Sequence, residues 1–145
     1  MMRLIARSDI TSNTGSVTVP TTTLDQFCAE HEIKHINVLK LDIQGGELLA
    51  LRGAQRMLAA GAIDLIYSEV SFSPIYDGQA FFHDLAPLLL GYGYPLYNLF
   101  PLTHTRNGIV SWTDAIWISS EMERGLTERA QARPKRSVAP ETFGS

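Results

Sequence analysis

The segment INVLKLDIQGGELLALRGA, residues 36–54, determines the architecture that the sequence predicts. Its apolar run from Val38 to Ile43 predicts a strand covered on both faces, as in the parallel sheets of α/β proteins. Asp42 lies near the end of this strand, two glycines follow it, and apolar residues then recur at helical spacing behind Glu47. The segment therefore predicts a strand, a tight turn and a helix. Ligands of such sheets bind outside the carboxyl ends of the strands, so we expect Asp42 at a functional crevice.

The flanking sequence predicts one α/β domain around this unit. Thr23 and Gln26 have capping-box spacing, and Gly53 is expected to kink or break the helix that follows Asp42. Pro87 should kink its helix or separate the last turn. We expect a short strand at 16–19, helices at 24–32, 47–60 and 80–90, and further strands at 63–70, 96–100 and 115–119.

The ends of the chain differ in composition from its centre. Residues 1–16 are polar and predict a loop, whereas residues 17–120 carry the apolar patterns of the domain. Residues 72–79 are rich in turn formers and predict a second loop. Residues 121–145 have few apolar side chains and predict a frayed helix followed by a disordered tail.

Composition excludes several classes of function. The net charge of −3 and the pI near 5.7 disfavour binding to nucleic acid. The single cysteine, Cys28, falls at an apolar helix position, where a small core residue is expected rather than a nucleophile. His31 and His35 flank Glu32, but no cysteine or acidic pattern completes a metal site. No signal peptide or membrane span is recognisable, so the sequence predicts a cytoplasmic protein that does not bind membranes.

The central segment also carries a family resemblance. Residues 40–47, KLDIQGGE, followed by LRGA at 51–54, resemble the signature of the FkbM family of methyltransferases. Residues 19–25 resemble the family's "V-x-x-x-T-L-D" entry, and Ser68-Glu69, the segment 72–79 and Gly93-Tyr94 follow in the family's order. The resemblance extends from about Val17 to Ile118. It implies a Rossmann-like enzyme that uses S-adenosylmethionine to methylate a small-molecule hydroxyl, of a sugar or a secondary metabolite.

One part of the family pattern is missing from this sequence. No G-x-G or D-x-G-x-x-x-G turn precedes the Asp42 strand, although the resemblance implies such a turn to hold the cofactor. We therefore expect a partial Rossmann-like sheet of mostly parallel strands with flanking helices, closed by an antiparallel hairpin. The chain should bind S-adenosylmethionine weakly or not at all. The Asp42 strand should have an open edge, a route to self-association or to a partner chain.

Three residues are candidates for catalysis. Asp42 and Glu69 each end a predicted strand, and either carboxylate could take a proton from a hydroxyl, accept a hydrogen bond from the acceptor, or stabilise the sulfonium. Asp42 is also the one candidate for cofactor binding, although it could instead cap the next helix. Lys40 could pair with either acid, or its stem could pack while its amine stays in water.

Two aromatic residues are candidates for substrate binding. Phe72 and Tyr76 lie in the loop directly after the Glu69 strand, where they could form a lid over the acceptor. Phe72 could equally close the core while Tyr76 packs at its edge. Two rival functions are a non-catalytic remnant that docks a chain carrying the cofactor-binding half, and a generic nucleotide-binding protein. The absence of a phosphate loop disfavours the latter.

Overall fold

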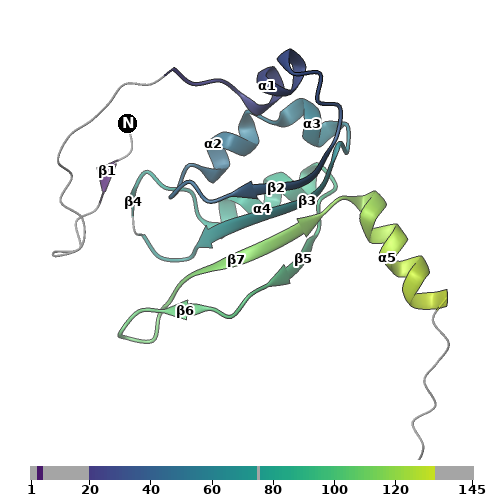
Figure 1. Ribbon diagram of the computed structural model, residues 1–145. Helices are drawn as coiled ribbons and strands as arrows, with labels where there is room; N and C mark the ends of the chain where they lie inside the picture. Colours follow the sequence, from purple (N-terminus) through teal and green to yellow (C-terminus); the bar gives the residue numbers. More distant parts are fainter. Residues whose placement is uncertain (1–2, 5–19, 75, 133–145) are drawn as a thin grey trace, which may run out of the picture.

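The computed structural model describes residues 3–4, 20–74 and 76–132 (Figure 1). The helices are α1 (Leu24–Glu30), α2 (Glu47–Arg52), α3 (Gln55–Ala59), α4 (Phe82–Gly91) and α5 (Ser120–Ala132). The strands are β1 (Arg3–Leu4), β2 (Ile36–Leu41), β3 (Ile63–Ser71), β4 (Tyr76–Asp77), β5 (Leu96–Leu99), β6 (Thr103–His104) and β7 (Val110–Ile118). The expected strand at 16–19 and the expected disorder beyond Ala132 lie outside the described residues.

The main sheet has the strand order β2-β3-β7-β5, and β6 also pairs with β7. Among the described strands, only β2 and β3 pair in parallel, and they are joined by the crossover through α2 and α3. The prediction of mostly parallel strands was wrong, because β7 returns between β3 and β5 and runs antiparallel to both. The predicted closing hairpin of β5 and β7 is confirmed, but β7 begins at Val110 rather than at Ala115.

One face of this sheet carries the core. Along β3 the buried positions alternate, with Ile66, Ser68 and Val70 buried on the face that the helices cover. Trp117 of β7 lies on the same face, and its ring stacks on Phe82 of α4 at 6.4 Å. Figure 1 shows α1, α2 and α3 on this side of β2, with α4 behind the sheet. The core therefore lies between the sheet and these four helices.

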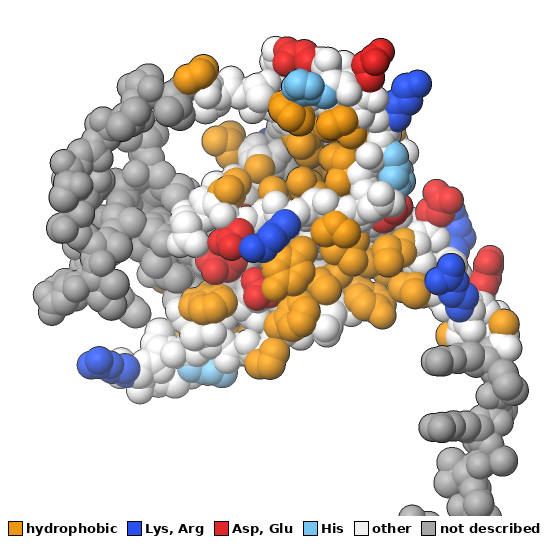
Figure 2. Space-filling view, viewed as in Figure 1, with side chains coloured by type: hydrophobic (Ala, Val, Ile, Leu, Met, Phe, Trp, Pro, Cys, Tyr) orange, Lys and Arg blue, Asp and Glu red, His pale blue; other side chains and the backbone are white. Residues whose placement is uncertain are grey.

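The opposite face of the sheet is largely open. Val38 of β2 is 60% exposed, and the neighbouring Lys40 is exposed as well. The prediction that this strand is covered on both faces was therefore wrong, because every described helix from α1 to α4 packs on the other side. Figure 2 shows the result as a broad hydrophobic patch across the sheet. Tyr67 of β3 and Phe100, whose rings are 5.8 Å apart, belong to this face.

The helices α1, α2 and α3 begin and end largely as predicted. The predicted long helix breaks at Gly53 into α2 and α3, where an added Cβ would lie 3.3 Å from the Cβ of Thr23. Gly61 ends α3 with a φ of 63°, as expected of a residue that follows a helix C-cap. Thr23 caps α1 as predicted, but Gln26 does not reach back to it and donates instead to Glu30.

Other expected details differ from the structure. Pro87 lies inside a continuous α4, which is neither split nor shortened at that residue. The backbone of the predicted N-terminal loop contributes β1, which pairs with β4 inside the second predicted loop. Among the described residues, no helix has the length and apolar character needed to cross a membrane. Cys28 is buried in the core, as predicted.

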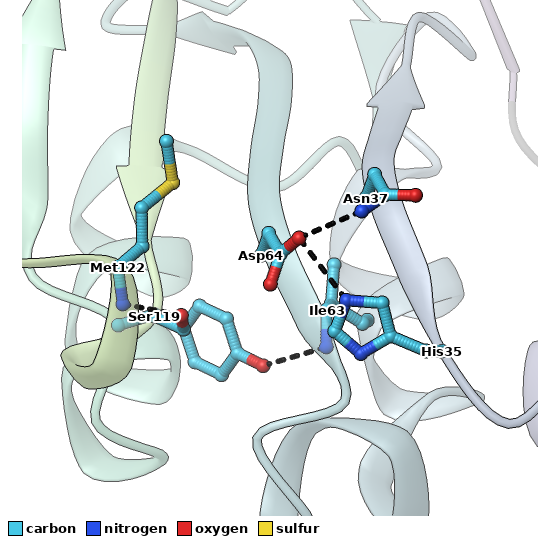
Figure 3. A network of polar contacts seen from close by, with 7 residues as sticks. His35, Asn37, Ile63, Asp64, Ser119 and Met122 are labelled. Carbon is cyan, nitrogen blue, oxygen red and sulfur yellow. Dashed lines mark hydrogen bonds and ion pairs between the residues drawn. The ribbon is translucent and has the colours of Figure 1, made fainter. Parts of the chain in front are cut away.

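A polar network joins the amino ends of β2 and β3 (Figure 3). Asp64 accepts a hydrogen bond from Asn37 at 2.9 Å and lies 3.0 Å from the Nε2 atom of His35. Its backbone carbonyl also accepts a hydrogen bond from the backbone N–H of Ser119, the residue that follows β7. Hydrogen bonding to His35 is the main reason that the pKa of Asp64 is lowered. His35 therefore has a structural partner at the amino ends of these strands, whereas Asp42 follows the carboxyl end of β2.

Candidate functional site at the carboxyl ends of β2 and β3

The candidate site lies where the two parallel strands end. Asp42 follows β2 directly, and Glu69 lies two residues before the end of β3. The strands β2 and β3 are parallel and in register, with Lys40 opposite Tyr67. Their carboxyl ends therefore lie side by side at the same end of the sheet. Figure 2 shows acidic side chains and a basic side chain at that edge of the hydrophobic patch.

Asp42 is held by its neighbours in sequence. The Lys40 Nζ atom lies 3.1 Å from one carboxylate oxygen, and the Gln44 side-chain amide donates to the other at 3.3 Å. The hydrogen bond from Lys40, followed by its charge and by the bond from Gln44, lowers the pKa of Asp42. The carboxylate is about half exposed and therefore accessible to a ligand.

The turn after Asp42 is built by its backbone. Gln44 has a φ of 54° and Gly45 a φ of 97°, two successive positive values that reverse the chain. Glu47 then buries its side chain, and its carboxylate accepts a hydrogen bond from the backbone N–H of Ile43 at 3.0 Å. This motif glutamate therefore closes the turn onto α2. The turn fixes the position of Asp42.

Glu69 lies on the open face among other acids. Burial is the main cause that raises its pKa, followed by the charges of Asp42, Glu47 and Asp114. Asp114 of β7 is directly opposite Glu69 in the antiparallel pairing. Like charges at such positions repel each other, which favours a proton on one of them. The predicted catalytic residues Asp42, Glu69 and Lys40 thus lie together near the carboxyl ends of β2 and β3.

Two residues of this site were missed by sequence reasoning. Hydrogen bonding to Asp114 is the largest cause that raises the pKa of Tyr67, and Asp42 adds a smaller effect. Tyr67 and Asp114 therefore belong to the same electrostatic environment as Glu69. Alternation along β3 was a signal for Tyr67, two residues before Glu69. Asp114 had no such signal, because it lies in the part of β7 that the sequence did not predict to be a strand.

The two predicted substrate-binding residues lie differently. Phe72 packs against the core, with its ring stacked on Phe82 at 5.3 Å. Its backbone N–H donates to the carbonyl of Ser111. The structure therefore places Phe72 with α4, on the side of the sheet opposite the acids. Tyr76 contributes its backbone to β4, and its side chain lies outside the described residues.

The charged side chains of the site are mostly acidic. Among residues 3–4, 20–74 and 76–132, no group of three or more His, Cys, Asp or Glu side chains is placed to hold a metal ion. The acids Asp42, Glu69 and Asp114 instead form a negative surface with one basic residue, Lys40. A group with a positive charge and hydroxyls would complement this surface.

An α/β sheet with acids at the ends of adjacent parallel strands is typical of enzymes that bind small molecules there. Comparison with known families is more specific. The family described as "Methyltransferase FkbM domain" matches residues 4–96, and the chain belongs to this family. The match ends at the first residue of β5, so it covers less of the C-terminal hairpin than the resemblance of the motifs suggested.

A curated relative supports the same family. The chain is 32% identical over 65 residues to the "2-O-methyltransferase NoeI" of Sinorhizobium fredii (strain NBRC 101917 / NGR234). The similar segment is 45% of this chain and 26% of that protein, so the chain matches about a quarter of the relative's length. No solved structure matches the chain.

Proposed function

We propose that this chain forms the acceptor side of an S-adenosylmethionine-dependent O-methyltransferase. The observation that carries the proposal is the arrangement of Asp42, Lys40 and Glu69 at adjacent carboxyl ends of the one parallel strand pair. Membership of the FkbM family supports methyl transfer. The name of the relative, a 2-O-methyltransferase, supports a hydroxyl acceptor. A sugar or a secondary metabolite remains the proposed acceptor class.

Asp42 and Glu69 are assigned different roles. Glu69 is the proposed general base, because its raised pKa brings it nearer to neutral pH, where a base removes a hydroxyl proton most effectively. Asp42 has a lowered pKa and is held by Lys40, so it is better suited to orient a ligand. Asp42 is the residue proposed to contact the cofactor. Phe72 then contributes to the core beneath the site, and the proposed acceptor contact of Tyr76 awaits a test.

S-adenosylmethionine, when bound, supplies an electrophilic methyl group on a positively charged sulfur. The negative surface of Asp42, Glu69 and Asp114 fits that charge. The residues of this chain would orient the acceptor hydroxyl toward the methyl group and accept its proton at the carboxylate of Glu69. Alignment of the two reacting groups accounts for much of the acceleration in such transfers.

The test measures transfer of a radiolabelled methyl group from S-adenosylmethionine, supplied at millimolar concentration because weak binding is expected, to a panel of mono- and oligosaccharides. Glu69→Gln should lower the rate by roughly 100-fold or more, the usual contribution of a general base. Glu123→Gln on the exposed surface of α5 is the matched control and should leave the rate unchanged. Equal rates for the two variants would refute the role of Glu69.

The second candidate is a non-catalytic subunit that docks a chain carrying the cofactor-binding half. The open edge of β2 favours it, because this edge has no partner strand in the described part of the chain. The two candidates give different results in the same assay. Methyl transfer by this chain alone supports the first, whereas transfer that requires an added second protein supports the second.

A further inference from the structure

Three carboxylates lie in one row across three neighbouring strands. Glu69 of β3 is directly opposite Asp114 of β7 in the antiparallel pairing. On the other side of β3, Leu41 is the last residue of β2 that pairs, opposite Ser68, so the next residue of the chain, Asp42, lies beside Glu69. Opposite residues of antiparallel strands have Cβ atoms about 5 Å apart. Glu69 is therefore the middle member of this row of acids.

The residues two positions earlier on β2 and β3 are hydrogen-bond donors to the two outer acids. Lys40 lies opposite Tyr67, and its Nζ atom donates to Asp42 at 3.1 Å. The hydroxyl of Tyr67 donates to the carboxylate of Asp114, and this hydrogen bond is the largest cause that raises the pKa of Tyr67. In the described part of the chain, no side chain is recorded as a donor to the carboxylate of Glu69. The middle acid therefore differs from both of its neighbours.

Phe100, which follows β5, holds the ring of Tyr67 in place. The two rings lie 5.8 Å apart. The backbone N–H of Phe100 donates to the backbone carbonyl of Asp114 at 3.0 Å, and its carbonyl accepts from the hydroxyl of Thr113 at 2.9 Å. Phe100 is thus fixed to β7 by both sides of its backbone. It packs against Tyr67 beside the residue that the Tyr67 hydroxyl contacts.

We propose that Tyr67 acts through Asp114 as a positioning residue, which directs proton uptake in this row to Glu69. The inference rests on the proposed role of Glu69 as the base. A donated hydrogen bond stabilises a carboxylate as an anion, and an anion directly opposite Glu69 favours a proton there. The proton of the acceptor hydroxyl moves to a carboxylate oxygen of Glu69, whose charge is neutralised. The acceptor oxygen keeps the electron pair with which it takes the methyl group.

The charged groups around Glu69 favour the same outcome. Asp42 from the end of β2, Glu47 from α2 and Asp114 from β7 all raise the pKa of Glu69, after the larger effect of burial. Lys40 is the cation beside this row, and it is paired with Asp42. Repulsion from three sides therefore favours a neutral Glu69.

Carbon-13 NMR of the full chain, labelled at the glutamate carboxyl carbons, follows the protonation of Glu69 without cofactor or acceptor. The signal of Glu69 is the one lost in Glu69→Gln. Tyr67→Phe keeps the ring against Phe100 and removes only the hydroxyl. Asp114 should then take a share of the proton, so the midpoint of the Glu69 titration should fall by about 0.5 pH unit and its transition should broaden, as for coupled acids. Tyr97→Phe, at an exposed residue of β5, is the matched control and should leave the midpoint unchanged.

A second background shows whether the effect passes through Asp114. Asp114→Asn removes the opposing charge, so Glu69 should titrate in one sharper step and at a lower pH than in the wild type. Adding Tyr67→Phe to this variant should change nothing further. An unchanged midpoint in Tyr67→Phe alone, or an equal shift in the Asp114→Asn background, would overturn the proposal.

The methyl-transfer assay separates this proposal from the proposed function. A wild-type rate in Glu69→Gln would refute the role of Glu69 as the base, and with it the role of Tyr67 in catalysis. If Glu69→Gln is slow as expected, the acid limb of the pH profile of kcat should move to lower pH in Tyr67→Phe, by the same amount as the Glu69 midpoint. An acid limb that stays in place would overturn the role of Tyr67 and leave the proposed function standing.

Discussion

At the scale of the residue, Glu69 links function to stability. Burial and the neighbouring acids raise its pKa above the ordinary value of 4.5. The unfolded chain therefore loses this proton at a lower pH than the folded chain, and stability falls as the pH rises from about 4.5 through the raised pKa. Glu69→Gln removes this loss. We expect the variant to melt at a higher temperature than the wild type at pH 7 and at nearly the same temperature at pH 4.

Thermal unfolding followed by circular dichroism at the two pH values checks this expectation. Glu123→Gln is the control, because Glu123 is exposed on α5 and should show no such dependence. A gain of equal size at both pH values would contradict the electrostatic explanation. A variant that is more stable and less active is also what a carboxylate kept for catalysis would give.

Gly45 gives a second prediction at this scale. Its φ of 97° is one that side chains with a Cβ rarely adopt, and Gly45 completes the turn that positions Asp42. Gly45→Ala should lower the free energy of unfolding by roughly 1–3 kcal/mol. Gly125→Ala is the matched control, because Gly125 lies within α5 with open space around it. It should be neutral or slightly stabilising in urea denaturation. An equally small effect at both glycines would show that the turn is not strained.

At the scale of the element, Asp25 connects two helices. Its carboxylate accepts hydrogen bonds from the backbone N–H groups of Arg56, at 2.8 Å, and Met57, at 3.0 Å. Its own backbone N–H donates to the carbonyl of Gly53. Asp25, in the first turn of α1, therefore caps α3. The two family motifs TLD and LRGA meet at this contact.

Asp25→Ala leaves the first N–H groups of α3 without this acceptor. We expect a loss of about 1 kcal/mol in the free energy of unfolding, as for other helix caps. Asp25→Asn keeps one acceptor oxygen and should lose less. Urea denaturation measures both, with Glu30→Ala at the exposed end of α1 as the control. If Glu30→Ala were as destabilising as Asp25→Ala, the loss would reflect the helix α1 rather than the cap.

The sequence predicted elements better than their pairing. Thr23 and Gly53 marked the ends of helices correctly, because caps and breaks depend on local residues. The position of β7 between β3 and β5 has no local signal, and the prediction of a mostly parallel sheet failed for that reason. The first half of β7 was missed because the polar residues Ser111 and Thr113 alternate there, although both are buried.

At the scale of the whole molecule, the environment of β2 differs from the one that its local pattern predicted. A run as apolar as residues 38–43 predicted burial on both sides, yet Val38 is exposed. The apolar pattern indicates that the strand suits burial on both faces, but the described residues cover only one face of β2. For the candidate site, Asp42, Glu69 and Lys40 were predictable from strand ends. Tyr67 and Asp114 required the pairing of β3 with β7.

The same reasoning predicts how the chain binds S-adenosylmethionine. The residues at the carboxyl ends of β2 and β3 offer acids to its charged sulfur, but the sequence before β2 has no glycine-rich turn to hold the rest of the molecule. Isothermal titration calorimetry of the full chain should therefore show no saturable binding in the micromolar range. Asp42→Asn should weaken any residual binding, because Asp42 is the one carboxylate proposed to contact the cofactor. Tight binding by the wild type would show that the residues of this chain suffice, and tight binding that Asp42→Asn leaves unchanged would also place the cofactor away from β2.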